Sequence, residues 1–254
     1  MKVRWGEEAA FPVPIPPNEA QRLAELKTFE ILDTPPEEVF DNITLLASHI
    51  CGTPIALITL IDSDRQWFKS KVGVTVAETS RDIALCAHAI IEEDLFVVPD
   101  ASRDKRFASN PLVRSHPRIR FYAGAPLMTR NRHALGTLCV IDRVPRTLTK
   151  GQREALRALS HQVMEQLETR RQSNLLHQRI TQQDADQSRL LRQLNQANAR
   201  KRAYEEACRQ MRREIRATNR AILNLVDQAE GRPEARKKLE SIRSLAQSLL
   251  ELGG

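Results

Sequence analysis

Two stretches decide the fold of this chain: residues 120–127, with the sequence RFYAGAPL, and residues 135–142, with the sequence LGTLCVID. Both are rich in β-branched, aromatic and other apolar residues and are bounded by turn-forming residues, which is typical of strands. The polar segment 131–133 between them predicts a hairpin. Gly124 and Gly136 lie inside the strand patterns. A glycine there indicates a bulge, a close approach by another backbone or a ligand, or simple relief of packing.

The bulk composition limits the classes of protein to consider. A chain of 254 residues can bury a core and form one or two domains. No apolar run approaches the roughly 20 residues that cross a bilayer, and the N-terminus lacks the apolar segment of a signal peptide, so we expect a cytoplasmic protein without membrane segments. The four cysteines are far apart and form no Cys-x-x-Cys pair, so we predict no metal site and no disulfide framework.

The net charge of +7 is confined to the C-terminal third of the chain. Residues 171–254 contain 17 Lys and Arg against 10 Asp and Glu, which leaves residues 1–170 neutral overall. A basic segment can meet nucleic acid or an acidic protein. This one lacks the interleaved aromatic residues of a strand-binding surface, so its charges indicate the solvated face of a helix rather than nucleic-acid binding.

The N-terminal part of the chain predicts two helices after an extended lead. Residues 1–17 end in a proline-rich segment, which cannot be helical because proline fixes φ and removes a donor. Asn18 is a candidate N-cap for a helix over residues 19–31. Thr34 is a candidate N-cap for a second helix that ends at Gly52.

The following segment predicts strands with helices between them. Residues 55–61 form a continuous apolar run, typical of a central strand covered on both faces, and residues 66–73 are its hairpin partner. A short helix over residues 82–91 and a strand over residues 95–99 follow. Because the strands and helices do not alternate as βαβ units, the pattern predicts an α+β domain built on an antiparallel sheet.

Short motifs follow one another in residues 18–170, and they include ILDTPP at 31–36, DxQWFKS at 64–70, CAH at 86–88, VPDA at 98–101, DxRF at 104–107, FYAGAPL at 121–127 and GTLCVID at 136–142. This ordered series resembles the GAF domain, in particular the GAF domains that precede bacterial histidine kinases and diguanylate cyclases. The resemblance implies a six-stranded antiparallel sheet flanked by helices, a small-molecule pocket over one face, and a regulatory role in signal transduction. It does not fix the ligand.

Aromatic, charged and sulfur-containing residues of this domain are the candidates to line such a pocket. Aromatic walls bury a ligand, and Lys or Arg can bind an anion. The alternative is that Arg81, Asp100 and Arg106 form structural ion pairs. The candidates are Trp67, Phe68, Lys69, Arg81, Cys86, His88, Asp100, Arg106, Phe107, Phe121, Tyr122 and Cys139.

Cys86, His88 and Cys139 could hold a soft metal or haem, or sense oxidants, but burial as core residues is the stronger interpretation. The motifs of bilin-binding GAF domains, of cyclic-nucleotide GAF domains and of free methionine sulfoxide reductases are not apparent in the sequence. The cofactor and ligand therefore stay open. We predict a protein without catalytic residues or enzymatic activity.

Residues 171–229 predict a coiled coil. Residues 152–228 contain neither glycine nor proline, so they can form one continuous helix that starts at the N-cap Thr149. Beyond the first turns, apolar residues recur with alternating spacings of three and four, which is the seam of a coiled coil with a few polar interruptions. The apolar seam residues are Leu176, Ile180, Leu190, Leu194, Ala197, Tyr204, Cys208, Met211, Ile215, Ile222 and Leu225.

Residues 230–254 predict a returning helix after a break at residues 231–233. The hairpin resembles, weakly, the dimerisation hairpin of histidine kinases, but Ala217 stands where the resemblance would place the phosphoacceptor histidine. Because one hairpin leaves an apolar face uncovered, we predict a parallel homodimer.

The leading interpretation is a non-catalytic signalling module whose GAF domain, at residues 18–170, senses a small molecule and passes a shift through the coiled coil to a helical bundle and a signalling-protein partner. The alternatives are a ligand-free protein-interaction scaffold, a regulatory fragment of a histidine kinase, and a thiol-based redox sensor.

Overall fold

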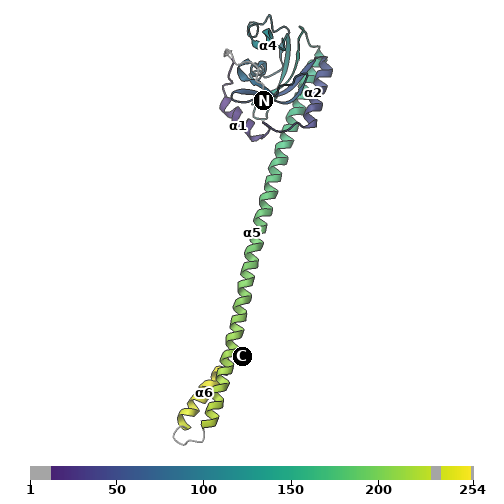
Figure 1. The fold of residues 1–254 in the computed structure, drawn as a ribbon. Coiled ribbons are helices and arrows are strands. Elements are labelled where there is room, and N and C mark those ends of the chain that lie inside the picture. Colours follow the sequence, from purple (N-terminus) through teal and green to yellow (C-terminus); the bar gives the residue numbers. More distant parts are fainter. Residues whose placement is uncertain (1–12, 230–235, 253–254) are drawn as a thin grey trace. The chain divides into compact units, whose positions relative to one another are not determined.

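A computed structural model describes residues 13–229 and 236–252 of the chain. These residues divide into two compact units, one ending at His177 and the other beginning at Gln178. The first unit contains an antiparallel sheet and most of the helices. The second contains the C-terminal part of a long helix and a short helix beside it (Figure 1).

The sheet has six strands in the order β3-β2-β1-β6-β5-β4, and every neighbouring pair is antiparallel. This confirms the predicted α+β class and the six-stranded sheet. The central strands are almost entirely buried because both faces of the sheet are covered, which explains their continuous apolar sequences. The strands are β1 (Ile55–Ile61), β2 (Arg65–Val72), β3 (Glu78–Ser80), β4 (Phe96–Val98), β5 (Phe121–Met128) and β6 (Ala134–Asp142).

The two glycines of the hairpin β5–β6 are required for different reasons. A Cβ atom on Gly136 would lie 1.8 Å from the carbonyl oxygen of Thr59 in β1, so β6 approaches its neighbouring strand more closely than a side chain allows. A Cβ atom on Gly124 would lie 2.3 Å from the hydroxyl of Tyr122. The predicted close approach by another backbone is therefore confirmed at Gly136, whereas Gly124 makes room for a side chain.

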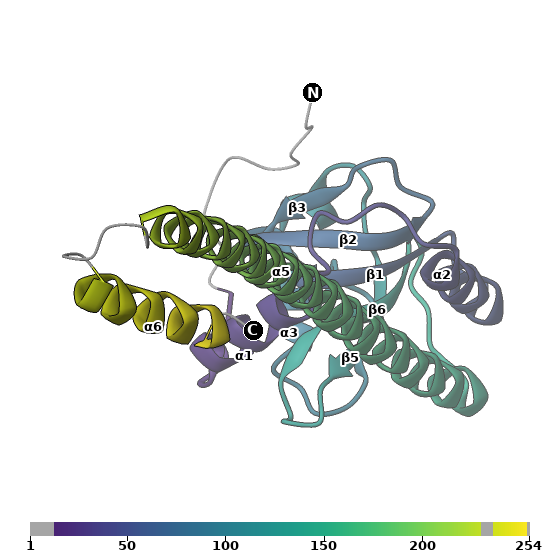
Figure 2. The ribbon, with the colours of Figure 1, turned by 90° about the horizontal axis from the view of Figure 1, so that it is seen from below.

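Three helices cover one face of the sheet: α1 (Glu19–Thr28), α2 (Glu38–Cys51) and the first turns of α5 (Lys150–Ala229) (Figure 2). Their apolar sides meet the inward side chains of the strands in one core. This core includes Leu26, Phe40, Ala47, Trp67, Phe121, Leu138, Leu156, Val163 and Leu167.

The opposite face of the sheet is covered by short elements: the 3-10 turn η1 (Arg81–Ile83), α3 (Leu85–Ala89), α4 (Pro111–Arg114) and the loops between them. Asn110 joins two of these elements, because its amide accepts a hydrogen bond from the Leu112 N–H at 2.9 Å and donates one to the Ile83 carbonyl at 3.0 Å. The second core, on this face, contains Cys86, Phe107, Tyr122 and Cys139.

The end of the first helix and the start of the second were predicted wrongly, whereas the predicted stop of the second helix at Gly52 is confirmed by the left-handed C-cap there, with φ of 62°. Helix α1 ends at Thr28 instead of residue 31, and a positive φ of 46° at Glu30 turns the chain so that both Phe29 and Ile31 enter the core. If the helix continued, Phe29 and Ile31 would lie on different sides of it and could not both enter the core. Helix α2 begins at Glu38 instead of following Thr34, because the Lys69 ammonium donates to the Thr34 hydroxyl and holds that segment extended.

The predicted helix over residues 82–91 is also wrong in extent. The chain forms η1, then an extended residue at Ala84 with ψ of 120°, and then the five-residue helix α3. The guanidinium of Arg81 donates to Glu19 and to the Asp62 carbonyl, which anchors the start of this segment away from a continuous helix. The predicted strand over residues 95–99 is confirmed in the shorter form β4.

Helix α5 begins at the predicted N-cap Thr149, which forms a reciprocal capping box with Gln152. The Thr149 hydroxyl accepts from the Gln152 N–H at 3.2 Å, and the Gln152 side chain accepts from the Thr149 N–H at 3.0 Å. The helix then runs without interruption for 80 residues, which confirms the continuous helix predicted over residues 152–228.

In the second unit, α6 (Arg236–Leu252) lies beside the last turns of α5 (Figure 1). The Arg243 guanidinium donates to the Asp227 carboxylate at 2.5 Å, and Val226 and Ala246 are buried between the helices. The predicted break at residues 231–233 and most of the predicted N-terminal lead, residues 1–12, lie outside the described residues. Among the helices that are described, none is both long and apolar enough to span a bilayer.

Candidate functional site

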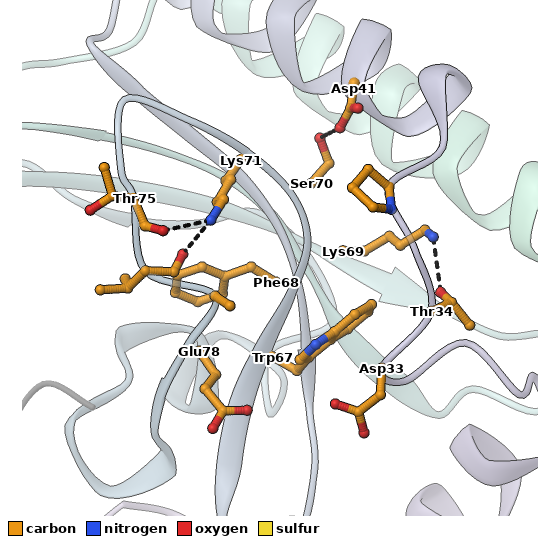
Figure 3. A pocket seen from close by; sticks show the side chains of 13 residues that line it. Asp33, Thr34, Asp41, Trp67, Phe68, Lys69, Ser70, Lys71, Thr75 and Glu78 are labelled. Atoms are coloured by element: carbon orange, nitrogen blue, oxygen red, sulfur yellow. Dashed lines mark hydrogen bonds between the residues drawn. The ribbon is translucent and has the colours of Figure 1, made fainter. Parts of the chain in front are cut away.

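A cavity of about 820 Å³ opens at the β3 side of the sheet, where the three-residue strand β3 pairs with only the first half of β2 (Figure 3). Its walls come from three segments: the stretch before and at the start of α2, strand β2, and the chain that leads into β3. The lining residues are Asp33, Thr34, Pro36, Asp41, Trp67, Phe68, Lys69, Ser70, Lys71, Thr75, Val76, Ala77 and Glu78.

Aromatic rings form the apolar part of this cavity. Trp67 and Phe68 are 7% and 8% exposed, so each presents only a small area to the cavity and is otherwise packed in the two cores. Phe68 and Val76 also line a second, apolar cavity of about 40 Å³ between the sheet and the segment that contains α4. These two side chains therefore lie on the wall that the two cavities share.

Lys69 is the bulged residue of β2. The pairing with β1 passes from Ile58 opposite Ser70 to Thr59 opposite Phe68, and Lys69 is left over. A bulge changes the direction of its side chain, and here it sends the lysine under the segment before α2. The Lys69 side chain is fully buried. Its ammonium donates to the hydroxyl of Thr34 at 3.0 Å, the carbonyl of Pro35 at 2.7 Å and the carboxylate of Glu37 at 2.6 Å.

The other polar groups of the cavity also have partners in the protein. The Ser70 hydroxyl donates to the Asp41 carboxylate at 2.6 Å, which joins β2 to α2. The Lys71 ammonium donates to the carbonyls of Thr75 and Val76 at 2.7 and 2.9 Å and holds the chain that leads into β3 (Figure 3). A ligand that binds through these polar groups has to replace these hydrogen bonds.

Glu37 connects the cavity to α5. Its Oε1 atom accepts from Lys69 and also from the Arg170 guanidinium, at 3.1 Å. Arg170 donates further to the carbonyls of Phe29 and Glu30 at 3.3 and 3.0 Å, so it fixes helix α5 to the turn after α1. A groove of about 440 Å³ lies between the start of α2 and this part of α5, and Glu37 and Arg170 both line it.

Other predicted candidates gather on the opposite face of the sheet. The Arg106 guanidinium lies over the rings of Phe96 and Phe107, 4.9 and 5.2 Å from their centroids, and His88 packs edge-on against Phe107 at 4.8 Å. Burial and the nearby charge of Arg106 lower the pKa of His88, so this imidazole is neutral at pH 7.

Cys86 and Cys139 meet in the same core with their Sγ atoms 3.7 Å apart. Burial opposes ionisation of Cys86, but the neighbouring polar groups of Cys139, Thr137, Thr59 and Tyr122 outweigh it and lower its pKa to about 7. Burial and the neighbouring Cys86 raise the pKa of Cys139.

The remaining candidates lie elsewhere. Arg81 is buried and paired with Glu19 at 2.6 Å, Asp100 accepts from Ser102 in an exposed loop, and Phe121 belongs to the core on the helix-covered face. The twelve candidates thus do not form one pocket. In residues 13–229 and 236–252, no group of three or more His, Cys, Asp or Glu side chains is placed to hold a metal ion.

Sequence reasoning found three of the lining residues and missed the others, which are Asp33, Thr34, Pro36, Asp41, Ser70, Lys71, Thr75, Val76, Ala77 and Glu78. Asp41 reaches the cavity because α2 packs on β2, and Glu78 reaches it because β3 pairs with β2. A signal that the sequence did offer is the presence of two lysines, Lys69 and Lys71, in β2, since charged side chains are typical of strands near the edge of a sheet.

The sequence model of the GAF domain matches residues 35–167, just over half of the chain. The chain belongs to the GAF domain family. The GAF domain is therefore the first unit of this protein, and a sensory role in signal transduction is the function that this family supports.

A cyclic di-GMP phosphodiesterase of Pseudomonas aeruginosa is 42% identical to the chain over 164 residues, which are 64% of this chain and 28% of that protein. The chain thus spans little more than a quarter of the relative.

Solved structures that are similar to this chain include the GAF domain of an Acinetobacter phosphoenolpyruvate-protein phosphotransferase, with 18% identity over 61% of this chain and 95% of that chain at a TM-score of 0.46. The free methionine-R-sulfoxide reductase of Neisseria meningitidis shows 16% identity over 68% and 99% at a TM-score of 0.45.

The Pseudomonas relative corrects one expectation. The sequence predicted a protein without enzymatic activity, and this is wrong in the light of a relative, 42% identical over the matched region, that is named as an enzyme. The predicted context of a histidine kinase or diguanylate cyclase stays a prediction, as do the pocket candidates, the homodimer and the signalling-protein partner.

Proposed function

We propose that this protein acts in the breakdown of cyclic di-GMP, with its GAF domain as the sensory input that sets the phosphodiesterase activity. The observation that carries the proposal is the 42% identity over 164 residues to a cyclic di-GMP phosphodiesterase. The family supports the sensory part of the proposal, because residues 35–167 match the GAF domain.

The cavity beside β2 is our candidate for the sensory pocket. At about 820 Å³ it has the size of a small-molecule site, and it combines aromatic surface from Trp67 and Phe68 with charged groups at its rim. A ligand that fits this lining has a ring or chain to place against the aromatic residues and a polar head to exchange hydrogen bonds with Ser70 and Lys71. A protein that acts only as a ligand-free scaffold would bind no small molecule in this cavity.

The path from the cavity to α5 in this proposal passes through Glu37. Because one carboxylate oxygen accepts from both Lys69 and Arg170, a ligand that draws Lys69 away strengthens the contact of Glu37 with Arg170, and the docking of α5 changes. For such a switch to work, the ligand must bind the two arrangements with different affinity.

Dimerisation through α5 is the second part of the mechanism that we propose. In the described single chain the predicted seam residues are largely solvent-exposed, for example Leu190 at 66%, Tyr204 at 72% and Met211 at 63%. A stripe of this length with spacings of three and four is buried when two copies pair as a parallel coiled coil. A change in docking at the first turns of α5 would then reach a partner as a change in rotation or register.

The test joins binding to activity. Native mass spectrometry and thermal shift on the full chain, with fractions of small molecules from a bacterial extract, identify a compound that raises its melting temperature. The 164-residue region of the Pseudomonas phosphodiesterase is then replaced by the matching region of this chain, and hydrolysis of cyclic di-GMP is followed by chromatography of the linear product. The unmodified full chain is assayed in parallel.

We expect the compound to change the hydrolysis rate of the chimera. The variant Lys71→Met should lose this response, and the matched variant Lys105→Met, at an exposed lysine outside the cavity lining, should keep it. A chimera whose hydrolysis ignores every stabilising compound would contradict the sensory proposal.

A further inference from the structure

The core on the face of the sheet that α3 covers contains an arrangement that the proposed function does not use. Cys86 in α3 and Cys139 in the middle of β6 place their Sγ atoms 3.7 Å apart, in van der Waals contact. The two residues are 53 positions apart in the sequence and belong to different layers of the domain. Both are buried, at 2% and 0% exposure.

Hydroxyl groups surround this pair of thiols in an otherwise apolar core. The hydroxyls of Thr59 and Thr137 lie 3.1 Å from each other on the adjacent strands β1 and β6. The Tyr122 hydroxyl is fully buried beside the sulfurs and has no hydrogen bond of ordinary geometry within the described part of the chain. Buried hydroxyls are costly unless they are paired, so a polar cluster here needs a reason beyond packing.

We propose that Cys86 and Cys139 form a dithiol that hydrogen peroxide oxidises to an internal disulfide, so that the domain carries an oxidant-responsive site apart from the β2 cavity. A disulfide requires the sulfurs to approach to about 2.0 Å, so they must close a gap of roughly 1.7 Å. Helix α3 supplies this movement, because it has only five residues, whereas β6 is fixed between β1 and β5.

The chemistry follows from the ionisation of the two thiols. The Cys86 thiolate, which its low pKa of about 7 makes available at neutral pH, attacks one peroxide oxygen. The O–O bond breaks, and Cys86 becomes a sulfenic acid while the other oxygen leaves as water with the proton of the original thiol. The Cys139 sulfur then attacks the Cys86 sulfur, the S–O bond breaks, and the hydroxyl leaves as a second water with the Cys139 proton. Two thiols lose two electrons, and one peroxide is reduced to two waters.

Burial sets the rate of this reaction. A peroxide reaches the sulfurs only when α3 and its flanking turns open locally, so oxidation is slow in the native protein and faster in low concentrations of urea that do not unfold it. Cys51 provides an internal control. It is buried in the core on the other face, and burial raises its pKa to about 11, so it stays a thiol under the same treatment.

The experiment uses the full chain with Cys208→Ser, which removes the thiol on α5. The protein is treated with hydrogen peroxide, quenched, and examined by intact mass and by peptide mapping without reduction. We expect a loss of two hydrogen atoms, a peptide pair joined through Cys86 and Cys139, and complete reversal by dithiothreitol. Adding Cys139→Ser should stop the reaction at a sulfenic acid on Cys86 that dimedone traps. Adding Cys86→Ser should abolish the reaction.

Three outcomes would overturn the proposal: retention of all thiols at peroxide concentrations that oxidise exposed cysteines, modification of Cys51 as fast as Cys86, or oxidation of Cys139 at an unchanged rate in the Cys86→Ser variant. Circular dichroism melting of each variant shows that it is folded. Because serine differs from cysteine by one atom, a folded variant that fails to react reports on the thiol itself.

Discussion

The ammonium of Lys69 lies 2.6 Å from Oε1 of Glu37, and the lysine side chain is completely excluded from solvent. Glu37 itself is partly exposed, at 36% of its side chain. A buried charge of this kind requires a partner, so Glu37 holds the lysine in place at the entrance to α2. The same carboxylate oxygen accepts from Arg170, and the stability of this corner therefore depends on one group.

The variant Glu37→Gln tests this dependence. The amide oxygen can still accept a hydrogen bond but carries no charge, so we expect the free energy of unfolding of the first unit to fall by about 1–2 kcal/mol. Urea denaturation followed by the fluorescence of Trp67 measures it. The matched variant Glu38→Gln, at the exposed neighbouring position, should change the unfolding free energy by less than about 0.5 kcal/mol. Equal effects of the two variants would argue against a special role of Glu37.

Alanine substitutions at two glycines should change the unfolding free energy in opposite directions. In Gly136→Ala the new Cβ would meet the backbone of Thr59, which cannot move without separating β1 from β6, so we expect a loss of about 3 kcal/mol or more. In Gly151→Ala the new Cβ meets nothing within 4 Å, and alanine favours the first turn of α5 by about 0.5–1 kcal/mol. Chemical denaturation of both variants measures the two changes in unfolding free energy. A small loss for Gly136→Ala would contradict the conclusion that a Cβ atom has no room between β6 and β1.

Stability should depend on pH through Glu19. Burial opposes its ionisation, but hydrogen bonds and charge from Arg22 and Arg81 prevail and lower its pKa from 4.5 to about 2. In this interval the folded state binds fewer protons than the unfolded state, so this contribution is present above pH 4.5 and is lost as the pH falls toward 2.

We therefore expect the difference in unfolding free energy between the wild type and Glu19→Gln to shrink steadily between pH 5 and pH 2. Urea denaturation at each pH measures this difference. The control Glu165→Gln, at an exposed site on α5, should show no such trend. A difference that stays constant over this range would mean that Glu19 is not held ionised by the two arginines.

Cys208 reports on the proposed dimer. It occupies a seam position on α5, and the other three cysteines are buried. In a parallel pair the two copies of Cys208 face each other, so copper phenanthroline should give a disulfide-linked dimer on a non-reducing gel. Moving the thiol to the outer face with Cys208→Ser and Ala203→Cys should remove most of the cross-link. Cross-linking that is equal at both positions, or absent at both, would rule out this pairing.

The sheet could be predicted from the sequence, and the site only in part. The strands 55–61 and 135–142 have local signals, namely apolar runs with small residues at the point of close contact, and the helix from Thr149 has a cap and no breaker. The segment before α2 has a strong local signal for a helix start at Thr34. The structure overrides it because the Lys69 ammonium, from a distant strand, takes the polar groups of that segment.

The candidate residues show the same limit. Trp67, Phe68 and Lys69 line the cavity because they follow each other along one strand, and a local pattern is enough to find them. Asp41 and Glu78 join them only through the folding of α2 and β3 around β2. The contact of Cys86 with Cys139 depends on the position of α3 over β6, and no periodicity in the sequence specifies that position.

The bulge at Lys69 has one further consequence, for solubility. A strand with unpaired backbone groups is a template for adding strands of other molecules. The pairing of β3 with β2 covers only residues 65–67 of β2, with one further backbone hydrogen bond from the Phe68 N–H to the Ala77 carbonyl at 3.0 Å. The bulge breaks the regular repeat of donors and acceptors there, and Lys71 places a charge along the same edge. The features that shape the cavity thus also protect the sheet from aggregation by edge-to-edge pairing.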